Sequence, residues 1–231
     1  MIQIAAESSL FEVAGHTIEN VSRFKLLGHT IDTGSTSAFV NARIASATGQ
    51  YHKFRHVFGD RTINKFSKIR FLEAYVRSRL TYAVSATAPT EEQLSSLSAC
   101  WYRLLRRLHP FGFARKQLPY GTVGTAFAMW NDALNSYFST PPIRDFMHVQ
   151  FLKYVAHIVR RDASHPTKMA LFIESKKRAS LAVWQKVTYL LGLDRDDSIK
   201  KMKTKKDFTM VLQARFPYLK KSARQPTKAQ T

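Results

Sequence analysis

The chain has 231 residues, of which 45% are hydrophobic and 12% aromatic, a composition typical of a folded protein. Its 36 lysines and arginines outnumber 16 acidic residues, which gives a formal net charge of +20. So positive a chain favours polyanionic partners, nucleic acid first and an anionic membrane surface second. No apolar run is long enough to span a bilayer, and one cysteine excludes an intrachain disulfide and fits a reducing, intracellular compartment.

The first predicted element is a β-hairpin, in which short apolar stretches flank a bend at Gly15-His16. An extended segment is expected to follow it. Gly28 in this segment marks a tight bend or a close backbone approach, because glycine has no Cβ. The local pattern alone is typical of an ordinary hairpin on a small domain.

The run Phe24-Lys25-Leu26-Leu27-Gly28-His29-Thr30-Ile31 also resembles the Phe-Lys-Tyr-Leu-Gly segment of non-LTR (LINE-type) retrotransposon reverse transcriptases, with Leu26 at the family's Tyr position. In that family the segment follows the polymerase palm. The resemblance implies a primer-grip-like motif, which holds the primer end near the active site, formed by Phe24, Lys25, Leu26, Leu27 and Gly28. It also implies that the chain begins after the palm.

Three helices are predicted next, near 36–58, 62–86 and 91–108, from apolar residues that recur at spacings of three and four. The third opens with a capping box, Thr90-Glu91-Glu92-Gln93. Cys100 is expected in the core, because the sequence places no base beside it. The other expected core residues are Val40, Phe54, Leu72, Val76, Leu97 and Trp101.

Basic side chains lie off the apolar stripes of these helices. The segment from Lys65 to Arg79 carries five cations and one acid, Glu73, which favours a phosphate-binding face over a merely soluble surface. The arginines at the end of the third helix also suit the helix dipole, so a structural role stays open for them. The candidate nucleic-acid-binding residues are Arg43, Lys53, Arg55, Lys65, Lys68, Arg70, Arg77, Arg106 and Arg107.

Two segments of these helices resemble the thumb that follows the palm in LINE-type enzymes. Leu80-Thr81-Tyr82-Ala83 corresponds to the family's Leu-x-Tyr-Gly, with Ala83 replacing Gly, and Leu105-Arg106-Arg107-Leu108 corresponds to Leu-Arg-x-x-Leu. The resemblance implies a helical thumb that packs on the template–primer duplex.

A loop over 110–122, with two prolines and two glycines, is the predicted boundary between two helical sections. Helices are expected near 123–138 and 141–160, the latter with Phe151 in its core. A last amphipathic stretch carries Trp184, and a short helix near 198–214 carries a lysine run from Lys200 to Lys206. That run is of the kind found in nuclear-import signals, although a solvated phosphate-binding face is the favoured interpretation. From Lys220 the tail is expected to be disordered.

Ala156-His157-Ile158-Val159-Arg160 resembles the Gly-His-x-x-Arg element of LINE-type polyproteins. A partly buried His157 that donates to a backbone carbonyl is favoured over a catalytic one. No Tyr-x-Asp-Asp turn or Cys/His ligand spacing occurs, and Asp196-Asp197 is expected to cap a helix. The chain is therefore expected to hold no metal or cofactor of its own, the Mg²⁺ of the family being held by palm aspartates.

Together these patterns predict a mainly α fold with a small N-terminal β-hairpin, a helical thumb-like bundle and a second helical section. The expected domains are 1–34, 35–110, 111–193 and 194–231. The resemblance implies a reverse transcriptase fragment that binds template–primer RNA and DNA, not membranes, without polymerising alone, and that works with a separate palm-bearing polypeptide. The alternatives are a free-standing basic helical nucleic-acid-binding or interaction protein, and an inactive remnant of a decayed element.

Overall fold

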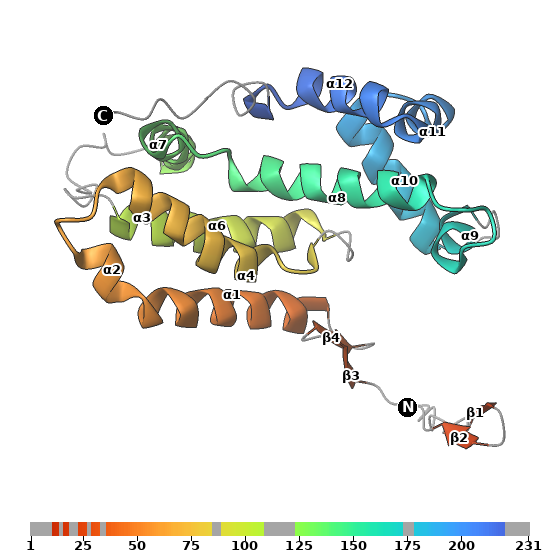
Figure 1. The fold of residues 1–231 in the computed structure, drawn as a ribbon, viewed down its shortest axis with the longest axis horizontal. Helices are drawn as coiled ribbons and strands as arrows, with labels where there is room; N and C mark the ends of the chain where they lie inside the picture. The colour runs from red at the N-terminus through yellow and green to blue at the C-terminus, as the bar shows by residue number, and fades with distance from the viewer. Residues whose placement is uncertain are drawn as a thin grey trace, which may run out of the picture.

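The computed structural model describes residues 11–13, 16–18, 23–26, 29–32, 36–84, 89–108, 123–172 and 178–219, with side chains described in 38–84, 89–108, 130–172 and 181–219. Helices make up most of these residues, so the predicted mainly α fold is confirmed (Figure 1). No helix among the described residues is both long and apolar enough to cross a membrane.

Four short strands precede the first helix. β1 (Phe11–Val13) pairs antiparallel with β2 (His16–Ile18), and β3 (Arg23–Leu26) pairs antiparallel with β4 (His29–Asp32). The two pairs form separate two-stranded sheets. β3 and β4 lie in the segment that was expected to be extended and that resembles the primer grip. From residue 36 onward the described part of the chain contains helices and no strand.

The predicted helix near 36–58 is two helices, α1 (Thr36–Lys53) and α2 (Arg55–Gly59). The helix breaks at Phe54, whose φ of −104° and ψ of 16° lie outside the helical range. The turn lets the rings of Phe54 and Phe58 face Phe71 of the next helix, at centroid distances of 4.9 and 5.9 Å. Aromatic packing between helices therefore decides the break, which the spacing of apolar residues along one helix does not reveal.

The second predicted helix is one rod made of α3 (Lys65–Leu72), a π-helical turn η1 (Glu73–Arg77) and α4 (Ser78–Thr81). It begins three residues later than predicted because the Asn64 side chain caps it, accepting from the Ser67 N–H at 2.8 Å. The rod ends at Thr81, and Ala83, two residues later, has a left-handed φ of 59°.

The third predicted helix is α6 (Glu91–Leu108), and its capping box is confirmed. The Gln93 N–H donates to Thr90 Oγ1 at 3.3 Å, and the Thr90 N–H donates to Gln93 Oε1 at 3.0 Å. α7 (Val123–Phe138) and α8 (Ile143–Val159) follow close to their predicted bounds. The remaining helices are α9 (Pro166–Phe172), α10 (Arg178–Leu191), α11 (Arg195–Lys203) and α12 (Lys205–Arg215).

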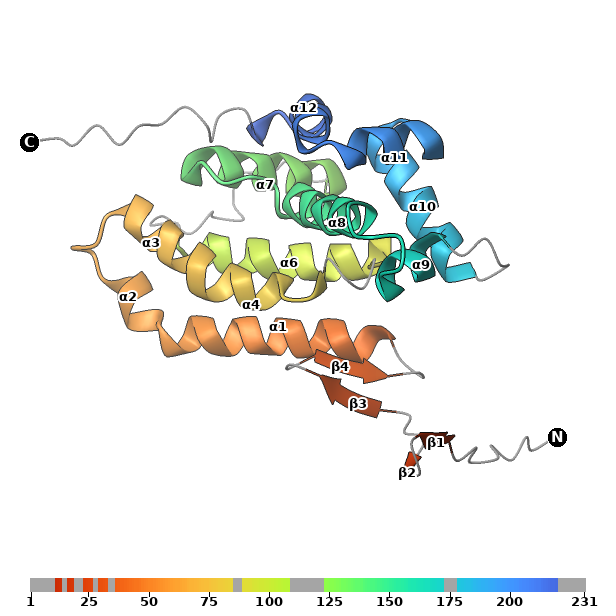
Figure 2. The same cartoon turned by 45° about the vertical axis from the view of Figure 1, so that its right-hand side comes forward.

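The first hydrophobic core lies between α1, the α3–α4 rod, α6, α7 and the start of α8 (Figure 2). Most expected core residues are buried in it, as is Cys100, which confirms those predictions. Phe54 is only partly buried and packs at the edge of the core. The confirmed residues are Val40, Leu72, Val76, Leu97 and Trp101, and Phe151 is buried in the second core.

The second core joins the later part of α8 to α9, α10, α11 and α12. α8 is therefore shared, with Met147 in the first core and Val149 in the second. The two cores meet along this helix. The predicted boundaries near residues 110 and 193 stay predictions. The apolar faces of the helices decide which of them share a core.

The short helix predicted near 198–214 is two helices, because Thr204 is extended at φ −101° and ψ 124°. Asp194 is the N-cap of α11 and accepts from the Asp197 N–H at 2.8 Å. Asp196 and Asp197, expected as the cap, lie instead in the first turn, where their charge suits the helix dipole. The tail predicted to be disordered from Lys220 lies outside the described residues.

Candidate nucleic-acid interface

The primer-grip-like residues lie around the β3–β4 pair. Phe24, Lys25 and Leu26 form β3, with Phe24 opposite Ile31 in the register. Leu27 and Gly28 lie outside the described residues, and β4 contacts α1. The motif is therefore adjacent in space to the helical bundle (Figure 2).

The candidate cations of α1 and α2 differ in their surroundings. Lys53 and Arg55 are exposed, at the turn where α1 gives way to α2. Arg43 is half-buried, with its guanidinium carbon 5.2 Å from the centroid of the Tyr82 ring and 5.7 Å from that of Phe39. Lys53 and Arg55 are available to phosphate oxygens, whereas Arg43 is held between aromatic rings.

On the α3–α4 rod, Lys65 and Arg70 are exposed and Lys68 is half-buried. The Lys65 ammonium lies 4.1 Å from the ring centroid of Tyr137 on α7. Lys65 and Arg70 therefore lie on exposed surface near the start of the rod, and phosphate binding by this face stays a prediction.

Arg77 was expected on the same basic face, but its side chain points towards the protein interior. It forms an ion pair with Glu73 at 2.5 Å, and its guanidinium lies 4.3 Å from the ring centroid of Phe146 on α8. Burial lowers the pKa of Arg77, and Glu73 opposes this shift. The expectation that Arg77 contacts phosphate is corrected, because the tertiary fold places α6 and α8 over its side of the rod.

Arg106 and Arg107 also differ in their exposure and contacts. Arg107 is exposed and lies over the ring of Tyr51, 5.7 Å from its centroid. Arg106 is half-buried, its Nη2 is 3.5 Å from Asn131 Oδ1, and burial lowers its pKa. Arg107 therefore faces solvent beside an aromatic ring, and Arg106 lines a recess between helices.

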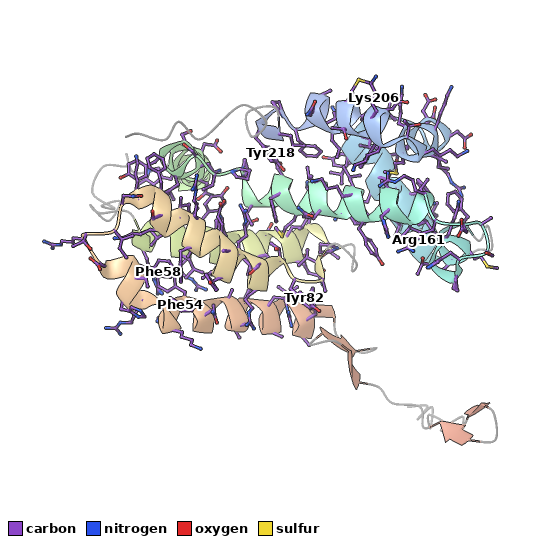
Figure 3. All side chains as sticks on the ribbon, viewed as in Figure 1. Phe54, Phe58, Tyr82, Arg161, Lys206 and Tyr218 are labelled. Carbon is purple, nitrogen blue, oxygen red and sulfur yellow. The ribbon has the colours of Figure 1, made fainter. Side chains whose placement is uncertain are left out.

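An aromatic cluster lies beside the exposed cations of α1, α2 and α3, near the labelled Phe54 and Phe58 (Figure 3). The rings of Phe71 and Tyr75 are 4.4 Å apart, and Phe54 lies 5.3 Å from Tyr75. Tyr75 is 46% exposed. Many proteins that bind single-stranded nucleic acid combine exposed aromatic rings, on which bases stack, with cations that contact the backbone. Tyr75 is not among the candidate residues named from the sequence, because the packing of α3 against α1 and α2 decides which aromatic rings stay exposed.

A second basic surface covers α11 and α12, where Lys206 is labelled in Figure 3. Its exposed cations belong to the lysine run and to the start of α11. Beneath them, Met202, Phe208 and Leu212 are buried in the second core. The cations are Arg195, Lys200, Lys203, Lys205 and Lys206.

His157 is exposed, contrary to the expectation of a partly buried histidine bonded to a carbonyl. Its Nε2 lies 2.8 Å from Nη2 and 3.1 Å from Nε of Arg161. Arg160 donates to the Met202 carbonyl at 2.9 Å and thereby ties the end of α8 to α11. Within the His-x-x-Arg pattern, Arg160 therefore links two helices, whereas His157 contacts Arg161, the residue after the pattern.

No group of three or more His, Cys, Asp or Glu side chains suited to a metal ion occurs among the described residues. Comparison with known proteins gave no match to a family model, to a curated protein or to a solved structure.

Proposed function

We propose that this chain binds template–primer nucleic acid through the phosphate backbone, as the part of a LINE-type reverse transcriptase that follows the palm. In this proposal, the segment from Phe24 to Gly28 is the primer-grip-like motif. The helices of the first core form the thumb-like bundle. The chain alone does not polymerise, because its sequence contains no Tyr-x-Asp-Asp turn to hold the catalytic metal ions.

The observation that carries the proposal is the excess of exposed cations over acidic partners. Where side chains are described, two ion pairs form, Arg77–Glu73 and Arg144–Glu91. Exposed cations such as Arg70 and Lys206 lie on both helical sections. A surface with so many cations lacking acidic partners attracts a polyanion, and binding is driven by the release of its counterions.

Ala83 supports the likeness to the thumb. Its φ of 59° is a left-handed conformation that costs a residue with a Cβ about 1–2 kcal/mol and costs glycine almost nothing. The thumb segment that Leu80-Thr81-Tyr82-Ala83 resembles has glycine at this position. A left-handed backbone at this position is the conformation that glycine adopts most easily, which supports the resemblance.

The second candidate is a free-standing basic helical protein that binds nucleic acid. The closely packed second core favours it, because α8 to α12 bury Trp184, Val187 and Met202 without needing another domain. The two candidates make the same prediction for backbone binding. They differ in the effect of a palm domain supplied as a separate chain, which should bind the β3–β4 end only under the first proposal.

The test is the salt dependence of binding to an RNA–DNA hybrid, measured by fluorescence anisotropy. We expect log Kd to rise linearly with log salt, and we expect two hybrids of unrelated sequence to give the same slope. Replacing Lys53, Arg55, Lys65 and Arg70 with Gln should lower the slope by about 0.9 for each phosphate that the variant no longer neutralises.

A matched control replaces the same number of cations on the other surface, Lys200, Lys203, Lys205 and Lys206. If only this control reduces the slope, the thumb-like surface is not the binding site. Salt-insensitive binding, or no binding at low salt, would refute the proposal altogether.

A further inference from the structure

A groove runs along the outward face of α6, bounded by Ile44 of α1 on one side and by α7 and α8 on the other. We call it the α6 groove. Its volume is about 670 Å³. Along α6 it extends from Ser95 to Arg106, which corresponds to about 16 Å of helix. It belongs neither to the aromatic cluster nor to the basic surface of α11 and α12.

The lining of the α6 groove includes three arginines, three serines and one asparagine. Arg103 and Arg106 enter it from α6, Arg144 from α8, and Asn131 from α7. Arg144 donates through Nη2 to Ser95 Oγ at 2.8 Å, so its guanidinium is already held against the groove. Guanidinium forks with neighbouring hydroxyl and amide donors are the groups that proteins use to bind phosphate.

Two polar atoms of the lining lack a hydrogen-bond partner among the described residues, Arg106 Nε and Ser98 Oγ. The bond that Arg106 forms to Asn131 is long, at 3.5 Å. A half-buried guanidinium with so few acceptors is costly, and an anion in the groove would offset that cost.

The acidic residue that pairs with a cation of the groove is Glu91, whose carboxylate lies 3.4 Å from Arg144 at one end. It does not line the groove, and both side chains of this pair are exposed. The pair is therefore weak, and Arg144 keeps its remaining donors for another acceptor. Arg103 and Arg106 have no ion pair with a described acidic residue.

We propose that the α6 groove binds successive phosphate groups of one nucleic-acid strand, an inference that rests on the proposed function and assigns it a site. Its length of about 16 Å along α6 is enough for more than one phosphate of an extended strand. Ala99, exposed near the middle of the lining, leaves room for the backbone to approach the helix.

The decisive variant is Ala99→Phe, which fills the α6 groove without changing the charge. Its matched control is Ala182→Phe, at an exposed alanine of α10. The probe is a fluorescent thymidine oligonucleotide of about twelve nucleotides, measured at low salt. We expect Ala99→Phe to weaken binding roughly tenfold and Ala182→Phe to leave it within about twofold. Circular dichroism and thermal melting establish that both variants fold.

A second pair of variants tests whether binding depends on cations in the groove or only on the total positive charge of the chain. Arg103→Gln with Arg144→Gln and Lys203→Gln with Lys206→Gln each remove two positive charges. We expect the groove pair to weaken binding several times more than the control pair. Equal effects of the two pairs, or wild-type affinity in Ala99→Phe, would refute the proposal that the groove binds the strand and would leave the proposed function standing.

Competition with inorganic pyrophosphate shows whether the α6 groove binds a nucleic-acid strand or a small phosphorylated molecule. We expect pyrophosphate to compete with the oligonucleotide only at millimolar concentration, because it fills one part of the groove. If the wild-type chain binds pyrophosphate tightly and Ala99→Phe abolishes this while no oligonucleotide binds, the groove is a site for a small phosphorylated molecule. The strand proposal would then fail, whereas the proposed function would still be decided by binding of the RNA–DNA hybrid.

Discussion

Arg70 and Arg77 lie on the same helical rod but have opposite surroundings. Arg70 is exposed, whereas Arg77 is paired with Glu73 and stacked on Phe146. Arg77 therefore serves the fold, and Arg70 is available to a ligand.

We expect Arg77→Gln to lower the free energy of unfolding by about 1–3 kcal/mol, since it leaves the partly buried Glu73 carboxylate without its partner. The salt slope of nucleic-acid binding should not change. Arg70→Gln should do the reverse, with stability within about 0.5 kcal/mol of wild type and a slope lower by about 0.9. Urea denaturation and salt titration measure the two effects, and a lower salt slope in Arg77→Gln would contradict this assignment.

Ala83 stores backbone strain at the end of α4. Ala83→Gly should raise the free energy of unfolding by about 0.5–1 kcal/mol, because relief of the left-handed conformation outweighs the greater chain entropy of glycine when unfolded. Ala99→Gly, in the middle of α6, is the control and should lower stability by about 1 kcal/mol. Chemical denaturation measures both, and a destabilising Ala83→Gly would show that the strain is not released.

At the scale of elements, α11 and α12 combine a basic outer surface with an apolar inner face. Met202 is fully buried beneath the exposed Lys203. Truncation near residue 193 would remove side chains of the second core, so it is unsuitable for testing whether the lysines bind nucleic acid. Charge substitution on the intact chain separates binding from folding.

We expect Met202→Ala to destabilise the chain by about 2–5 kcal/mol through loss of packing and the cavity it leaves. Lys203→Gln, at the next position of the same helix, should stay within about 0.5 kcal/mol of wild type. Thermal and urea melts by circular dichroism provide the measurement. If Met202→Ala costs no more than Lys203→Gln, α11 is not an integral part of the second core.

At the scale of the molecule, a polar cluster joins the two cores near the start of α8. His148 is buried, and the charged groups that act on it are Lys186 of α10, Glu91 of α6 and Arg144 of α8. Lys186 also donates to the Pro89 carbonyl and lies 5.7 Å from the ring centroid of Phe151. The junction of the cores therefore contains a histidine kept away from water.

Burial, assisted by Lys186, lowers the pKa of His148 to about 4. Between about pH 6.5 and 4 the unfolded chain binds a proton that the folded chain does not. The free energy of unfolding therefore decreases as the pH is lowered through this window, by at most about 1.4 kcal/mol per pH unit. We expect His148→Leu to weaken this dependence and His52→Leu, at an exposed histidine, to preserve it. Urea denaturation at several pH values is the measurement, and an unchanged profile in His148→Leu would exclude the assignment.

Much of the helical framework was predictable from the sequence, because an apolar residue every three or four positions and a capping box are local signals. Leu72, Val76, Leu97 and Trp101 are buried as that periodicity requires. The break at Phe54 and the division at Thr204 were not predicted, since contacts between helices and local backbone geometry decide them. In the candidate interface, the exposure of Lys53, Arg55 and Arg70 was predictable, because these residues lie off the apolar stripes of their helices.

The sequence by itself determined the charge of this protein, its helical class and which residues avoid the core, because these depend on composition and on the period of one helix. Tertiary structure alone decided that Arg77 turns inward, that α8 serves two cores, and that Arg103, Arg106 and Arg144 line one groove. The physical reason is that a charge becomes a structural partner or a binding group according to the neighbours that distant segments bring to it. Such neighbours are fixed by how helices pack, and no spacing along the chain encodes them directly.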